Sequence, residues 1–192
     1  MKRILCIGDS NTFGHDPRSY GGARYPEAVR WPGRLSGPER EVVNAGRNGA
    51  CIPRQAEYSD VGDLLHRSAP LDAVIVMLGT NDLLRGASVE ETGTRMGGLL
   101  SYLKPRLDGA RLLLISPPPM KRGSWVPTDE LVESSGKLSG AYRAAAERAG
   151  VRCADAGEWG VELIFDGVHF SPEGHAAFAK GAAAALEDIW RE

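Results

Sequence analysis

Five short apolar runs recur along the chain, separated by longer stretches in which apolar residues are spaced as on one face of a helix. The runs lie at Arg3–Ile7, Glu41–Asn44, Ala73–Leu78, Arg111–Ser116 and Val151–Asp155. Short continuous apolar runs of this kind are typical of parallel strands that are buried on both faces. The pattern therefore predicts five strands of one mostly parallel sheet.

Three stretches are expected to be helices: Val89–Lys104, Glu130–Ala149 and Pro172–Trp190. The last has the clearest start, since Ser171 suits an N-cap, Pro172 suits the first helical position and an acidic residue follows. Strands that alternate with helices predict an α/β fold. We expect a three-layer α/β/α, doubly wound sheet with helices on both faces.

The composition is that of an ordinary globular domain, and it excludes several classes of protein. The 192 residues, 42% hydrophobic and 25% charged, contain no repeat, low-complexity tract or linker, so we expect one domain over residues 1–192. A net charge of -2 gives no argument for a nucleic-acid partner or an anionic membrane surface. No run is long enough for a signal peptide or a membrane span, which predicts a cytoplasmic protein.

Two long loops are expected, at Asn11–Pro32 and at Pro117–Pro127. Long loops in a domain of this size are often binding loops, although a plain surface excursion fits as well. Their aromatic and imidazole side chains include His15, Tyr20, Tyr25, Trp31 and Trp125. We take Trp31 and Trp125 as candidate substrate-binding residues, with Trp159 as a further indole; burial in the core is the alternative for each.

Gly8-Asp9-Ser10-Asn11 directly follows the first apolar run. In an open α/β sheet, ligands are held beyond the carboxyl ends of the strands, so a serine at this point is a candidate nucleophile. Gly, Asp and Ser are also common in ordinary turns. We expect Asp9 to shape the turn rather than to transfer a proton.

A candidate base and its orienting acid lie together near the other end, in Asp166-Gly167-Val168-His169. A serine hydroxyl needs a base to take its proton, and imidazole titrates near neutral pH. On a tight turn the Asp166 carboxylate can reach the His169 Nδ1 proton and fix the tautomer. The alternatives are a turn-forming aspartate and a histidine ahead of a helix cap.

Candidate oxyanion donors follow the second and third runs. Asn81, in Gly79-Thr80-Asn81-Asp82, can donate from its side-chain amide, and the N–H groups of Gly49 and Ser10 can donate from the backbone. The alternatives are that Asp82 caps the next helix and that Gly46 and Gly49 only turn the chain.

Other catalytic signatures are absent. The sequence lacks the Gly-x-Ser-x-Gly elbow and the Gly-rich phosphate and dinucleotide loops. The four histidines have no metal-ligand spacing, and Cys6, Cys51 and Cys153 indicate neither a disulfide framework nor a metal site. We therefore expect no metal and no organic cofactor.

Taken together, these motifs resemble the SGNH/GDSL family of esterases and lipases along almost the whole chain. Gly8-Asp9-Ser10 resembles the first block, with Asn11 where many members carry leucine. The stretch from residue 44 to Gly49 resembles the second, residues 79–82 the third, and residues 166–169 the fifth. The resemblance implies a flavodoxin-like sheet, a Ser10–His169–Asp166 triad, and an oxyanion hole formed by Ser10, Gly49 and Asn81.

A narrower likeness, to the arylesterase/acyltransferase branch, rests on residues 29–33, 76–82 and 116–119. It implies a serine esterase acting on small, short-chain acetyl-type esters, with transfer of the acyl group to alcohols in some members. It also leaves a homo-oligomer open, although the segment after Asp82 is shorter than that branch leads us to expect. Two other interpretations remain: a carbohydrate O-acetyl esterase, and a catalytically inactive ligand-binding module on the same fold.

Overall fold

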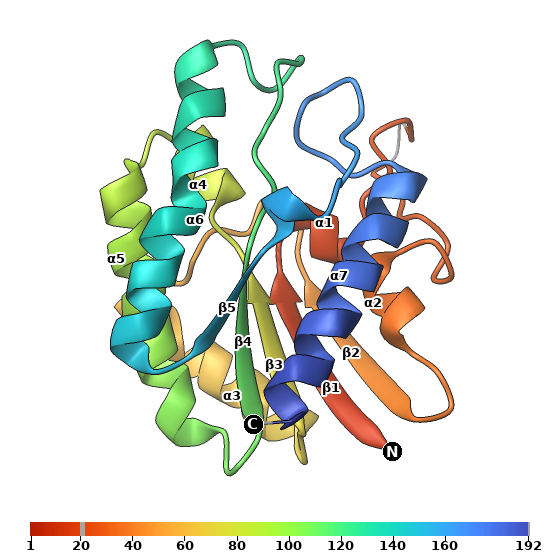
Figure 1. The fold of residues 1–192 in the computed structure, drawn as a ribbon, viewed down its shortest axis with the longest axis vertical. Helices are drawn as coiled ribbons and strands as arrows, with labels where there is room; N and C mark the ends of the chain where they lie inside the picture. Colours follow the sequence, from red (N-terminus) through yellow and green to blue (C-terminus); the bar gives the residue numbers. More distant parts are fainter. Residues whose placement is uncertain (20–21, 192) are drawn as a thin grey trace.

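A five-stranded, all-parallel sheet forms the centre of the protein, in the order β2-β1-β3-β4-β5 (Figure 1). The computed structural model describes residues 1–19 and 22–191. The strands are β1 (Lys2–Gly8), β2 (Arg40–Gly46), β3 (Ala73–Met77), β4 (Arg111–Ser116) and β5 (Arg152–Asp155). The five predicted strands and the doubly wound α/β fold are confirmed.

The helices include the three that the sequence predicts and several that it does not. They are α1 (Ser10–Phe13), α2 (Trp31–Leu35), α3 (Tyr58–Ser68), α4 (Thr80–Leu84), α5 (Val89–Leu103), α6 (Asp129–Ala149) and α7 (Pro172–Arg191), with 3-10 turns η1 (Gln55–Glu57), η2 (Lys104–Arg106) and η3 (Ala156–Glu158). The expected loop Asn11–Pro32 is wrong at both ends, because α1 and α2 occupy them. The α3 helix buries only Val61, Leu65 and Ser68, too few for its apolar spacing to stand out.

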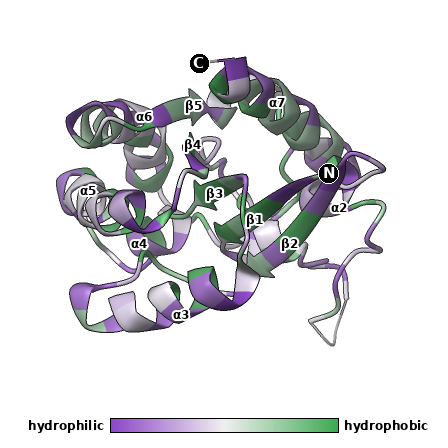
Figure 2. Cartoon of the chain, turned by 90° about the horizontal axis from the view of Figure 1, so that it is seen from below, coloured by the Kyte–Doolittle hydropathy of each residue, from purple (hydrophilic) through white to green (hydrophobic). Residues whose placement is uncertain are grey.

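Alternate side chains of each strand enter two separate cores. On one face, Leu5 and Val76 pack with residues of α3, α5 and α6. On the other face, Cys6 and Ile75 pack with residues of α2 and α7. Figure 2 shows the strands between these two sets of helices. No helix in the described part of the chain combines the length and apolarity needed to cross a membrane.

The order of the strands brings three loops together. β1 lies between β2 and β3, and in the register Gly8 is opposite both Gly46 and Met77. All three strands are parallel, so the chain leaves each of them at the same edge of the sheet. Such a switch point, where successive connections leave to opposite sides, forms a natural crevice for a ligand.

Candidate active site

A tight turn places Ser10 at the carboxyl end of β1, as the first residue of α1. The Asp9 carboxylate caps this short helix by accepting a 2.9 Å hydrogen bond from the Asn11 N–H. Gly8 is required here, because a Cβ would lie 2.0 Å from the Thr12 Oγ1 atom. Burial raises the pKa of Asp9 to about 6, and this side chain helps to form the turn, as predicted.

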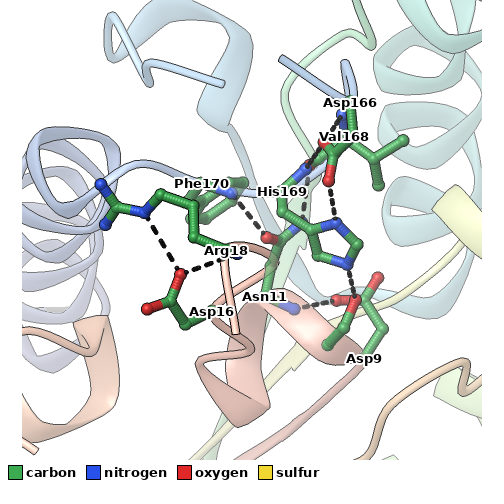
Figure 3. A network of polar contacts seen from close by, with 9 residues as sticks. Asp9, Asn11, Asp16, Arg18, Asp166, Val168, His169 and Phe170 are labelled. Carbon is green, nitrogen blue, oxygen red and sulfur yellow. Dashed lines mark hydrogen bonds and ion pairs between the residues drawn. The ribbon is translucent and has the colours of Figure 1, made fainter. Parts of the chain in front are cut away.

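The Ser10 hydroxyl lies in direct contact with the imidazole of His169. The distance from Ser10 Oγ to His169 Nε2 is 2.9 Å, and that from His169 Nδ1 to Asp166 Oδ2 is 2.7 Å (Figure 3). The base and the acid are nearly inaccessible, with His169 2% and Asp166 1% exposed. The structure thus brings a hydroxyl, a base and an acid from opposite ends of the chain into one hydrogen-bonded series.

The turn that carries Asp166 holds its carboxylate ionised. Burial by itself would raise the pKa of Asp166, but hydrogen bonds from the His169 ring and from the N–H groups of His169 and Val168 lower it below its usual value. A carboxylate can only accept, so it fixes the proton on His169 Nδ1 and leaves Nε2 as the acceptor for the Ser10 hydroxyl. This arrangement can activate a serine by general-base catalysis.

Residues of the loops after β2 and β3 are tied to each other beside the end of β1. The Asn81 amide donates from Nδ2 to the Ala50 carbonyl at 3.0 Å, and the Arg85 guanidinium donates to the Gly49 carbonyl at 2.9 Å. Gly49 has a positive φ of 69°, which suits a glycine. A carboxamide has two N–H bonds, and one bond to Ala50 leaves the other for a ligand.

The alternative roles considered for Asp82, a helix cap, and for Gly46, a simple turn, differ from what the structure shows. Asp82 is not a helix cap: it lies inside α4, where its carboxylate accepts from the Ile52 N–H at 3.0 Å and pairs with Arg95 at 3.1 Å. Gly46 does more than turn the chain, because a Cβ there would lie 2.1 Å from the Phe13 N atom of the nucleophile's helix.

Of the tryptophans proposed to bind substrate, Trp125 lies at the site and Trp31 does not. The Trp125 ring is 56% exposed and meets the His169 ring edge-on, with the centroids 5.4 Å apart. Trp31 is 0% exposed and packs on Phe178 in the core under α7. The prediction for Trp31 is therefore wrong, because an indole with no accessible surface cannot contact a substrate. Trp159 packs on the same Phe178.

Two side chains beside the base were noted in the sequence but were given no role at the site. The centroid of the His15 ring lies 4.8 Å from that of the His169 ring. The pKa of His15 is lowered from its usual value, first by burial and second by the electrostatic interaction with His169. Asn11, 3% exposed, hydrogen-bonds the backbone on both sides of His169. Their positions in the segment right after Ser10 were the only available signal. Tyr20, from the same segment, lies outside the described residues.

No metal cluster is found at this site. Across residues 1–19 and 22–191, no three His, Cys, Asp or Glu side chains are grouped so that they could hold a metal ion. His175 lies in the core with its Nδ1 accepting from the Trp31 N–H at 3.3 Å, and burial lowers its pKa to about 3.

Comparison with known proteins agrees with this geometry. The model of the GDSL-like lipase/acylhydrolase family matches residues 6–177. A structure of a carbohydrate acetylesterase family member from Sinorhizobium meliloti superposes with a TM-score of 0.85 at 27% identity, covering 98% of this chain and 99% of the other. The M. smegmatis aryl esterase gives 0.81 at 28%, with the same coverage. A protein of Agrobacterium tumefaciens str. C58 proposed to be an arylesterase gives 0.83 at 32%, covering 98% and 100%. A search of curated proteins found no match.

Proposed function

The chain belongs to the GDSL-like lipase/acylhydrolase family and is a carboxylic ester hydrolase of the SGNH type, and from that premise we propose that it cleaves short-chain, acetyl-type esters through an acyl-enzyme on Ser10. The observation that carries the proposal is the series of contacts from Ser10 Oγ through the His169 ring to Asp166, at 2.9 and 2.7 Å. The third interpretation of the sequence, an inactive binding module, is not supported, because the chain is an ester hydrolase by family.

In the first half of the reaction, Ser10 Oγ attacks the ester carbonyl carbon while His169 Nε2 takes the hydroxyl proton. The carbonyl π electrons move onto its oxygen, giving a tetrahedral oxyanion. When this intermediate collapses, the C–O bond to the alcohol breaks, and His169 returns the proton to the departing oxygen. The products of this half are the free alcohol and an acetyl group esterified to Ser10.

In the second half, a water molecule attacks the acyl carbon and His169 takes its proton. Collapse of the second intermediate releases the carboxylic acid and restores the Ser10 hydroxyl. An alcohol in place of water would give a new ester instead, which is acyl transfer. Asp166 stays ionised throughout and stabilises the imidazolium that forms in each half.

The oxyanion is stabilised by three donors: the Asn81 side-chain amide and the backbone N–H groups of Ser10 and Gly49. The bond from Asn81 to Ala50 aligns the amide with the turn that follows Gly49. Donors fixed in advance stabilise the developing charge without reorganising during the reaction, which makes them worth more than the same groups in water.

Replacing Asn81 with alanine is expected to lower kcat by about 100- to 1000-fold, equivalent to about 3–4 kcal/mol in the barrier, the usual cost of removing one oxyanion donor. Steady-state kinetics on phenyl acetate measure the effect, and thermal unfolding checks that the variant is folded. Gln55→Ala, which shortens an exposed amide on η1, is the matched control and should leave kcat unchanged. A loss below about threefold for Asn81→Ala would remove this amide from the mechanism.

The test of the function itself is a panel of esters that differ in one part at a time. Acyl groups from acetyl to octanoyl on a phenol measure chain-length preference, and each is run with and without a competing alcohol to separate hydrolysis from transfer. We expect the acetyl ester to have the highest kcat/KM. A preference for octanoyl over acetyl, or no turnover of any member, would contradict the proposed substrate.

A carbohydrate O-acetyl esterase is the second candidate. The exposed Trp125 ring beside His169 favours it, because sugars stack on accessible aromatic faces, and a carbohydrate acetylesterase family member is among the similar structures. Comparing kcat/KM for acetylated xylose with that for phenyl acetate separates the two candidates. A sugar ester turned over at least tenfold better than phenyl acetate would establish the second.

A further inference from the structure

The side chain of Asn11 joins the segment that carries the nucleophile to the segment that carries the base. Its Nδ2 donates to the Val168 carbonyl at 3.1 Å, and its Oδ1 accepts from the Phe170 N–H at 3.0 Å (Figure 3). These backbone groups lie on either side of His169. The two segments are 157 residues apart at the first bond and 159 at the second, so both contacts are long-range.

The backbone of His169 itself is bonded elsewhere. Its N–H donates to Asp166 at 2.9 Å, and its carbonyl accepts from the Ile164 N–H at 2.9 Å. Asn11 forms hydrogen bonds with the two neighbouring backbone groups, the carbonyl of Val168 and the N–H of Phe170. A peptide group of an adjacent β-strand would pair with a backbone in the same way. With all of these groups paired, the backbone at position 169 is held from both sides.

Few hydrogen bonds join the two segments directly. Among the described residues, the hydrogen bonds between residues 9–15 and residues 162–170 are the two from Asn11 and the Ser10–His169 contact. The other long-range backbone bonds of the base turn, to Lys121 and Trp125, tie it to the loop after β4 instead. The Asp166–His169 bond spans three residues, so it orients the ring within its own turn but not relative to Ser10.

We propose that Asn11 is a positioning residue that holds the His169 imidazole within hydrogen-bond distance of the Ser10 hydroxyl by clamping the backbone on both sides of the base. The proposal rests on the catalytic roles of Ser10 and His169 given above. Because Asn11 is next to the nucleophile in the chain, these bonds fix the position of His169 relative to Ser10. A displacement of the Ser10 segment would therefore also displace His169. Misplacing a reacting group by about 1 Å can cost on the order of 100-fold in rate.

A carboxamide suits this position for a chemical reason. It offers one donor and one acceptor in a plane, matching a carbonyl and an N–H, and it carries no charge beside a base whose charge changes during the reaction. Leucine, which many family members carry here, has the same branching and the same number of side-chain heavy atoms but can make neither bond. Asn11→Leu therefore removes both hydrogen bonds while keeping a branched side chain at this buried position.

Asn11→Leu is expected to lower kcat for phenyl acetate by about 10- to 100-fold, with KM changed by less than about threefold, since the clamp affects the reacting groups and not substrate contacts. The matched control is Thr92→Val, which removes another buried side-chain-to-backbone bond, from Thr92 Oγ1 to the Ser88 carbonyl at 2.7 Å on α5. This control should keep full kcat. Thermal unfolding of both variants measures any loss of stability separately.

Two further measurements distinguish positioning from a merely structural role. The downfield proton resonance of His169 Nδ1–H should persist in Asn11→Leu, because the Asp166 bond is local to the turn. The rate constant for phosphonylation of Ser10 by a p-nitrophenyl phosphonate should fall in parallel with kcat. Loss of the resonance together with the rate would show a general loosening of the site and would overturn the proposal.

Asn11→Ala is the second variant, in case leucine prevents folding. Its smaller side chain leaves space for a water that can bond to the two backbone groups, so folding is expected with an intermediate loss of kcat. Full kcat in either folded variant overturns the clamp. If Ser10→Ala also keeps its turnover, the proposed function has failed; if Ser10→Ala is inactive while the Asn11 variants are fully active, only the clamp has failed.

Discussion

Replacing Ser10 with alanine is expected to lower kcat for an activated acetate ester by on the order of 10⁶-fold, because members of a triad act as one unit and little catalysis remains without the nucleophile. The loss should exceed that of any single oxyanion donor. The Ser10 Oγ lies 2.9 Å from His169 Nε2, and no other hydroxyl or thiol in the described part of the chain forms a hydrogen bond with that nitrogen. Steady-state kinetics on p-nitrophenyl acetate measure the effect.

Several measurements keep this result interpretable. Ser101→Ala makes the same chemical change on the exposed face of α5, far from the imidazole, and should keep full activity. An active-site phosphonate should label the native protein and Ser101→Ala but not Ser10→Ala. Turnover within about tenfold of the native protein in Ser10→Ala, at unchanged thermal stability, is incompatible with an acyl-enzyme at this position.

The sheet and the triad could be predicted because each depends on a local pattern combined with one general rule. A buried parallel strand is a continuous apolar run, and β4 was predicted with its observed bounds, Arg111–Ser116. Parallel strands end at one edge, so Ser10 and Asn81 could be expected near each other without knowledge of any contact. Asp166 and His169 lie in one turn, where sequence spacing alone allows a hydrogen bond.

What the sequence could not give depends on which way a side chain points. Trp31 and Trp125 have the same side chain and both lie in expected loops, yet Trp31 is 0% and Trp125 56% exposed. The first begins a helix that packs on α7, and the second extends from a loop beside the base. The hydrophobic periodicity of the sequence cannot distinguish the buried tryptophan from the exposed one, because a helix as short as α2 has too few residues to show a periodic pattern.

Asn11 illustrates a second limit, since its partners are backbone groups at the far end of the chain. A backbone carbonyl or N–H has no sequence signature, so a side chain that pairs with one at long range looks like any polar residue in a turn. Burial makes such a residue informative: most polar groups as buried as Asn11, which is 3% exposed, form hydrogen bonds, and the partners then indicate its role.

Replacing Asp166 with asparagine is expected to lower kcat by about 10⁴-fold while leaving the fold intact. The amide oxygen can still accept from the N–H groups of Val168 and His169, as Oδ1 does at 2.9 Å. The NH₂ group then faces His169 Nδ1, and because it can only donate, the imidazole proton must move to Nε2. That nitrogen then presents a proton to the Ser10 hydroxyl and can no longer accept one.

A change of the His169 tautomer would alter the proton NMR spectrum as well as kcat. The resonance of His169 Nδ1–H should disappear in Asp166→Asn and persist in Asp188→Asn, which makes the same substitution at an exposed position on α7. The exposed control should also keep full kcat, since its partner Arg191 is on the surface. A folded Asp166→Asn variant that loses less than about tenfold in kcat would show that contacts other than the Asp166 carboxylate orient the base. The hydrogen bonds of Asn11 to the backbone on either side of His169 are the contacts placed to do so.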